Sequence, residues 1–228
     1  MSYLWQEFNI KTFPAETLVF RDGVFYDDLS DYKNAVFENN TIKINKKSDL
    51  PIHIIYIGEI AGNINLNIDI SGKNNKIIMT CKIINKKPAF LNIFIKNAGK
   101  NSIFDGNITV KNKKLLKINV IGQNTTENTG IFVKTRVAAY KNSETFLDGR
   151  AEIEKNIENC DSDISFSVMA YENAKITMKP MQYIKSVPNS AKHSASLYKP
   201  TDNQIQYLRT TGLSGAEINK VLEEAFLN

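Results

Sequence analysis

Few side chains in this sequence could ligate a metal ion or act as a nucleophile. The 228 residues include two cysteines, Cys81 and Cys160, and two histidines, His53 and His193. Thiolates and neutral imidazoles are good ligands for iron and for iron–sulfur clusters. Two cysteines exclude a disulfide framework and a four-thiolate metal site within one chain. The common phosphate-binding, dinucleotide-binding, hydrolase and zinc-protease motifs are absent, so we expect no enzyme and no catalytic residue.

The sequence around each of these four residues predicts a different role for it. Cys81 lies within an apolar run, which predicts a small core residue, and His53 alternates with isoleucines, so its side chain points away from theirs. Cys160 has two interpretations, a thiolate ligand or a partly exposed thiol without a role. His193 also has two, an iron ligand or a structural histidine held by hydrogen bonds.

Two pairs of acidic residues suggest a different chemistry. They are Glu152 with Glu154 and Asp161 with Asp163. Enzymes that cleave polysaccharides use paired carboxyl groups as general acid and base. Acidic residues at alternate positions of an exposed strand are also commonly just solvated. A β-helix enzyme that acts on polysaccharides is therefore an alternative that these pairs leave open.

The charge is unevenly distributed along the chain. The formal net charge is +5, and residues 73–118 contain eleven lysines and a single acidic residue, Asp105. A basic segment can bind nucleic acid, but arginine, which is favoured for phosphate and base recognition, is missing from this one. Lysines beside exposed strands also prevent strands from pairing at their edges. We therefore expect no nucleic-acid partner.

The sequence gives no sign of a membrane or secreted location. It has no run of about 18 apolar residues that could form a transmembrane helix. Its first eight residues have no basic segment followed by a long apolar stretch, as a secretory signal would. We expect a cytoplasmic protein without a membrane partner.

Short strands are predicted from residue 17 to about residue 185. Apolar and polar residues alternate with period two, as in the run Ile64-Asn-Leu-Asn-Ile-Asp-Ile70, which is typical of half-buried strands. Turn signals every 8–12 residues favour a sandwich, a barrel or a solenoid. Many breaks are single asparagines or glycines, which suit solenoid corners, but no repeat of fixed length is visible. Periodicity leaves a β-solenoid and a two-sheet sandwich equally open.

The last thirty residues predict two helices. Thr201 or Asp202 can cap the first helix, which should end at Gly212, and Ser214 with Glu217 forms a capping box for the second. The second helix has one apolar stripe, which should be buried on the β body or on a partner and which consists of Ile218, Val221, Leu222, Ala225 and Phe226.

The C-terminal fifth of the chain resembles the SufB/SufD family of iron–sulfur cluster assembly proteins. Lys179-Pro180 and the strand up to Ile184 are similar to the family's Lys-Pro-x-Leu-x-Ile, and His193 falls at the spacing of its histidine. The segment NQIQYLRTTGLS (203–214) is similar to the family's D-E-Q-x-F-Y-L-x-S-R-G-L-S. Looser matches are LVFRDGVF (18–25) and DGRAEI (148–153), so the resemblance covers most of residues 17–228.

The resemblance implies a right-handed parallel β-helix followed by a helical hairpin, that is, an all-β fold with a small C-terminal α region. It divides the chain into an N-terminal extension (1–16), a β-helix core (17–199) and a helical region (200–228). It implies a scaffold subunit that pairs with a SufB-like protein, or with itself, and binds a SufC-like ABC-type ATPase. The residues that the resemblance assigns to ATPase binding are Gln204, Tyr207, Leu208, Gly212, Leu213 and Phe226.

Two positions favour the SufD branch. Ser194 follows His193, where the SufB pattern has glutamate, and Cys160 stands farther before Pro180 than the SufB cysteine does. SufD proteins also carry a large N-terminal helical domain, so this chain resembles a shortened SufD. The resemblance makes His193 a candidate ligand, and Cys160 a weaker one, of a transient cluster at the subunit interface, with no cofactor held permanently.

Overall fold

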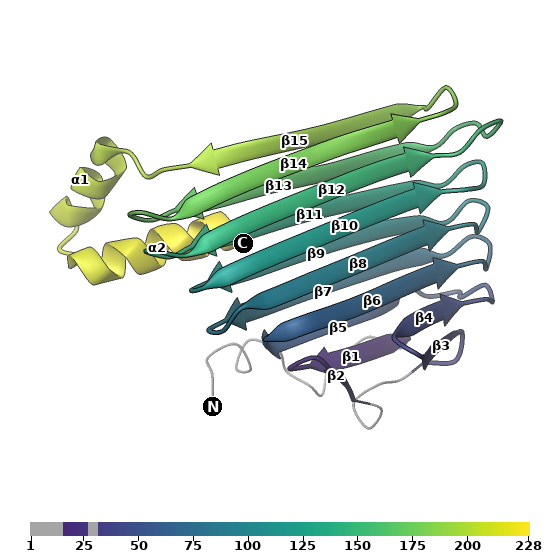
Figure 1. Ribbon diagram of the computed structural model, residues 1–228, viewed down its shortest axis with the longest axis horizontal. Coiled ribbons are helices and arrows are strands. Elements are labelled where there is room, and N and C mark those ends of the chain that lie inside the picture. The colour runs from purple at the N-terminus through teal and green to yellow at the C-terminus, as the bar shows by residue number, and fades with distance from the viewer. Residues whose placement is uncertain (1–15, 27–31) are drawn as a thin grey trace.

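The chain folds as a β-solenoid of about six turns followed by two helices (Figure 1). The computed structural model describes residues 16–26 and 32–228. The prediction of a parallel β-helix with a C-terminal helical pair is confirmed, and the sandwich alternative is wrong. The N-terminal extension that the sequence predicts lies outside the described residues except for Glu16.

From β4 onward consecutive strands alternate between two sheets, so each turn of the solenoid adds one strand to each. Sheet A has the order β15-β13-β11-β9-β7-β5-β1-β2 and sheet B the order β14-β12-β10-β8-β6-β4-β3. The strands of sheet A are β1 (Thr17–Arg21), β2 (Val24–Phe25), β5 (Ile52–Glu59), β7 (Lys76–Asn85), β9 (Ile103–Asn112), β11 (Gly130–Ala139), β13 (Asp161–Ala170) and β15 (Ser190–Tyr198). Those of sheet B are β3 (Ala35–Glu38), β4 (Thr41–Ile44), β6 (Gly62–Ile70), β8 (Ala89–Asn97), β10 (Leu115–Asn124), β12 (Glu144–Ile153) and β14 (Lys175–Ile184).

The core forms because strands stack in register along the solenoid. Residues paired across a parallel ladder project from the same face of the sheet, so inward positions form columns that run through the turns. One such column in sheet A passes through Ile54, Met79, Gly106, Val133, Ile164 and His193. Its four apolar side chains are fully buried, which matches the period-two pattern of the sequence.

Asparagine shapes the corners between strands. Many corner asparagines have positive φ, among them Asn74 and Asn101, and asparagine tolerates this conformation better than other residues with a side chain. The amide of Asn101 donates to Asn74 Oδ1 one turn below, at 3.0 Å. Between the parallel strands from β4 onward the chain therefore turns without hairpins, as the single-asparagine breaks in the sequence suggest.

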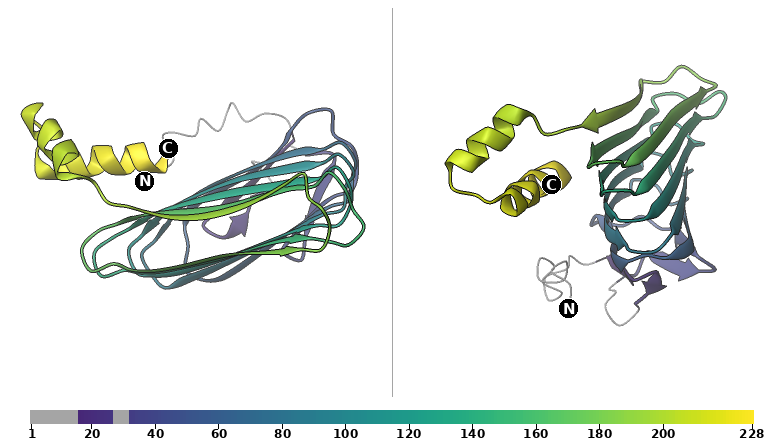
Figure 2. Two further views of the ribbon diagram at one scale, coloured as in Figure 1. Left: turned by 90° about the horizontal axis from the view of Figure 1, so that it is seen from above. Right: turned by 60° about the vertical axis from the view of Figure 1, so that its left-hand side comes forward.

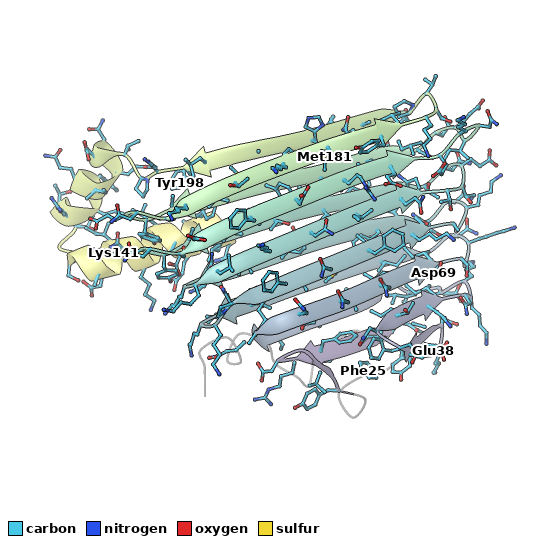
Figure 3. The ribbon with its side chains drawn as sticks, in the orientation of Figure 1. Phe25, Glu38, Asp69, Lys141, Met181 and Tyr198 are labelled. Atoms are coloured by element: carbon cyan, nitrogen blue, oxygen red, sulfur yellow. The ribbon has the colours of Figure 1, made fainter. Side chains whose placement is uncertain are left out.

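The two ends of the solenoid differ. At the first end, β1 with β2 and β3 with β4 form antiparallel hairpins, and Phe20, Phe25, Phe37 and Tyr56 pack against one another with ring centroids 4.8–5.8 Å apart. At the other end, β14 and β15 are the outermost strands of their sheets, and no hairpin or helix of the described residues lies across them (Figures 1 and 2).

The helices α1 (Asp202–Thr210) and α2 (Gly215–Leu227) lie beside the solenoid rather than over this open end (Figure 2). Thr201 caps α1, and Ser214 with Glu217 forms the predicted capping box of α2. α2 packs on its own β body, through Ile218 and Leu222 against Met169. The predicted stripe is wrong in part: Val221 and Ala225 are exposed, whereas Glu223 and Leu227 are buried.

The shift of the stripe has a physical cause. The carboxylate of Glu223 meets two partners on the β body, Lys111 Nζ at 2.9 Å and the hydroxyl of Tyr171 at 3.3 Å. A buried carboxylate needs such partners. The ion pair thus turns a charged face of α2 toward the sheet, which hydrophobic periodicity does not predict.

Candidate functional site

The candidate site is the open end of the solenoid. β14 pairs with β12 and β15 with β13, and no described strand pairs with their outer edges. An unpaired edge presents a row of backbone N–H and C=O groups to another chain. Pro180 removes one donor from β14, as is common in edge strands, but β15 contains no proline and keeps its full set of donors.

The open end also exposes a cross-section of the core. By register, Ala191, His193, Ala195 and Leu197 of β15 continue inward-facing columns of β13. In β13 the corresponding positions are fully buried, whereas Leu197 is 53% exposed. The inward side chains of β14 are half-buried: Ile176, Met178, Pro180, Gln182 and Ile184. Two strand edges and an apolar surface therefore lie together at this end.

His193 lies at the top of one of these columns. It is in register with Ile164, whose side chain is fully buried beneath it, and it is itself exposed. Among the described residues the imidazole has no hydrogen-bond partner. The interpretation of a histidine held by hydrogen bonds thus finds no support, and both ring nitrogens remain available to a metal ion or to another chain.

Cys160 lies elsewhere. Its side chain is fully buried, so the sequence-based expectation of a partly exposed thiol is wrong. Sγ lies 3.3 Å from the carbonyl oxygen of Thr126 and 3.5 Å from Oγ1 of Thr129, inside the solenoid. Its neighbour in the last turn is Asn189, whose N–H donates to the Cys160 carbonyl at 3.0 Å.

The structure does not bring Cys160 and His193 together. His193 follows Asn189 by four residues in the last turn, so the two candidate ligands are offset by about 13 Å along the strand. The thiol also faces the interior one turn below the open end. A SufB-like site built from both residues of one chain is not formed.

Cys81 and His53, the other two residues that could ligate a metal ion, lie away from the candidate site. Cys81 is fully buried, and burial raises the pKa of its thiol to about 12, so it is the small core residue that the sequence predicts. His53 is half-buried on the outer face of β5. Burial, with a smaller effect from Lys76, lowers the pKa of the His53 imidazole.

Three of the four residues in the acidic pairs are held in ion pairs or hydrogen bonds. Glu152 lies 2.6 Å from Arg150, and Glu154 lies 3.1 Å from Lys185. The hydrogen bond from Lys185 is the main cause that lowers the pKa of Glu154. Asp161 accepts a hydrogen bond from the amide of Asn189 at 3.0 Å. A glycosidase needs two carboxyl groups that are free to act on the substrate, whereas three of these four are held by neighbouring side chains.

Much of the helical region serves its own packing. Gln204 accepts a hydrogen bond from the N–H of Thr201 and closes the cap of α1. Gly212 ends the first helical segment with φ +85°. Three of the predicted partner residues pack in a small cluster around Met169 and Leu222: Leu208, Leu213 and Phe226. Tyr207 is 69% exposed, so it is the predicted residue whose side chain is most free to contact a partner.

The described residues form no ready-made metal centre. They contain no group of three or more His, Cys, Asp or Glu side chains that could hold an ion. One chain offers His193 alone at the open end, so a cluster bound there requires ligands from a second molecule.

Within residues 16–26 and 32–228, no helix has the length and apolar character needed to span a membrane.

Sequence reasoning missed the last strand. Within Ser190–Tyr198 the positions at even steps from Ala191 are small or apolar except for His193, and polar residues lie between them, which is a strand signal. Its low hydrophobicity hid that signal, because three of its nine residues are serine and two are alanine. The chain matches no protein-family model and no curated protein.

Proposed function

We propose that this chain is a non-catalytic, SufD-like subunit of an iron–sulfur cluster assembly scaffold. In this proposal the open end of the solenoid joins a SufB-like solenoid, and the helices bind a SufC-like ATPase. The observation that carries the proposal is the open last turn, where two unpaired strand edges, an apolar cross-section and His193 lie together. The resemblance of residues 179–226 to the SufB/SufD family supports the same assignment.

The geometry of the last turn supports end-to-end joining. A partner strand that adds to β15 satisfies its unpaired backbone groups, and a partner's inward side chains cover Leu197 and its neighbours. Stable interfaces combine such an apolar centre with a polar rim. The solenoid thereby continues from one molecule into the next with a shared core.

The iron–sulfur cluster is cargo in this function, built at the joint between the two subunits. His193 supplies one nitrogen ligand from this chain, and thiolates, which iron–sulfur clusters prefer, come from the partner. A cluster held in this way depends on both subunits, which suits assembly followed by release.

The ATPase partner supplies the energy. This chain has no phosphate-binding loop, so ATP hydrolysis belongs to the partner. α1 has no buried residue and begins four residues after β15 ends. A partner that moves α1 therefore acts directly on the strand that carries His193.

Co-purification under anaerobic conditions tests the proposal. The chain is expressed with a SufB-like protein and a SufC-like ATPase, and complex mass and visible iron–sulfur absorbance are measured. His193→Ala should keep all subunits and lose absorbance, whereas the control Ser194→Ala, next to it on the outward face, should keep both. Failure to form a complex with either protein would refute the proposal.

A further inference from the structure

The last turn of the solenoid is basic. Residues 171–198 contain four lysines, at positions 175, 179, 185 and 192, and one acidic residue, Glu172. The turn beneath it is acidic, because residues 140–170 contain seven acidic and three basic residues. The open end thus presents an excess of positive charge to whatever joins it.

Every lysine of the last turn stands over an acidic residue of the turn beneath. Lys175 Nζ lies 3.1 Å from Glu144, and Lys185 Nζ lies 3.1 Å from Glu154. Lys179 is in register with Asp148, and Lys192 with Asp163.

Ion pairs between neighbouring turns also occur at other places along the solenoid. Ion pairs link residues of opposite charge in successive turns, namely Glu59 with Lys86, Lys100 with Glu127, and Lys141 with Glu172. Opposite charges on neighbouring strands stabilise a sheet, and like charges opposite one another destabilise it. Charge alternation is therefore part of how one turn fits the next.

Two lysines remain available at the open end. Lys179 of β14 and Lys192 of β15 form no ion pair with any described residue, and both are exposed on the outer face of the last turn. Each of the two sheets contributes one of them. They are placed to meet carboxylates of a further turn.

We infer that the open end selects a solenoid whose own terminal turn is acidic, and that it disfavours a second copy of this chain. In a joint between two copies the unpaired lysines of one last turn would face those of the other, and like charges opposite one another destabilise a sheet. This inference rests on the end-to-end joining proposed above. The inference favours pairing with a SufB-like protein over pairing with a second copy of this chain, the two alternatives that the sequence left open.

The simpler role of these lysines is to keep a lone edge from pairing with anything, as lysine does at many sheet edges. Edge protection and partner selection predict different association with a partner whose terminal turn is acidic. If the lysines only protect the edge, an acidic end joins no better than a basic one.

A charge-swapped copy of the chain serves as the acidic probe. It carries Lys179→Glu and Lys192→Glu, with Asp148→Lys and Asp163→Lys beneath them so that opposite charges still face each other within the molecule. Circular dichroism and thermal unfolding check that it folds. The control copy carries Lys87→Glu and Lys114→Glu, two exposed lysines away from the open end.

Sedimentation velocity then measures self-association and mixed association. The wild type mixed with the charge-swapped copy should associate about tenfold or more tightly than the wild type alone, whereas the control copy should behave as the wild type does. Raising sodium chloride from about 50 to about 500 mM should weaken the mixed complex and strengthen wild-type self-association, because salt screens both the attraction and the repulsion.

Two results would overturn the inference. If the wild type forms an end-to-end homodimer as tightly as the mixture does, charge does not select the partner, although end-to-end joining itself survives. If neither combination associates at any salt concentration, the lysines only protect the edge. The co-purification described above still decides the proposed function separately.

Discussion

Leu197 and Val168 offer a direct measure of how open the last turn is. They are neighbours in register on β15 and β13, Val168 fully buried and Leu197 53% exposed. Val168→Ala removes two buried carbon atoms and leaves a cavity, so it should lower the free energy of unfolding by about 2 kcal/mol. Leu197→Ala removes three carbon atoms that are only half-buried, and the expected loss is about 1 kcal/mol.

The pair is informative because the larger deletion is expected to cost less. Urea unfolding followed by far-ultraviolet circular dichroism measures both variants against the wild type. When a partner covers the open end, Leu197 becomes buried, so Leu197→Ala should weaken the complex by more than the roughly 1 kcal/mol by which it weakens the isolated chain. If Leu197→Ala destabilises the isolated chain as much as Val168→Ala or more, the end is covered in solution by the chain itself, and our account of the last turn is wrong.

Three further predictions concern single side chains. Glu223→Gln removes the charge that pairs with Lys111 and should loosen α2 by about 1–2 kcal/mol, seen as faster amide hydrogen exchange in α2 with the solenoid unchanged; unchanged exchange would refute the role of this ion pair. Cys160 should react with a maleimide only after unfolding, and modification of the native chain at the rate of a free thiol would contradict its burial. Burial raises the pKa of Cys81 from 9.0 to about 12, so the folded state favours the neutral thiol: its contribution to stability is complete below pH 9 and is lost as the pH rises toward 12. Cys81→Ala should show a shallower loss of stability over this range in urea unfolding, and an identical pH profile would refute the assignment.

The strands and helices could be predicted from the sequence because their signals are local. Ile64, Leu66 and Ile68 alternate with asparagines, and Ser214 and Glu217 form the capping box that their spacing predicts. The path of the chain is not a local property. Period two shows that a strand is half-buried but does not show which strand lies beside it.

The repeat was invisible because the turns differ in length. Stacked residues are 25 positions apart between Ile54 and Met79 but 31 apart between Val133 and Ile164. The corners absorb the difference, so no fixed spacing connects the columns. The resemblance to a known family favoured the solenoid where periodicity could not.

The candidate site, too, is predicted in part from local sequence signals and in part depends on the fold. Spacing and resemblance single out His193, but its exposure depends on the register of β15 with β13 and on the absence of a further described strand above it. Cys160 looked similar in sequence, and only the fold shows that its thiol faces the interior. The pairing of lysines with acids of the turn beneath is likewise hidden until the register is known.

The unequal corners give this molecule a modular length. Each strand pairs in register with the strand of the turn beneath, whatever the number of residues in the preceding corner. The spacings of 25 and 31 residues between stacked positions show this. Residues can therefore be gained or lost at a corner without sliding a core side chain to the outer face. A whole turn added within the body would lengthen the solenoid by about 4.8 Å and leave its two ends chemically as they are.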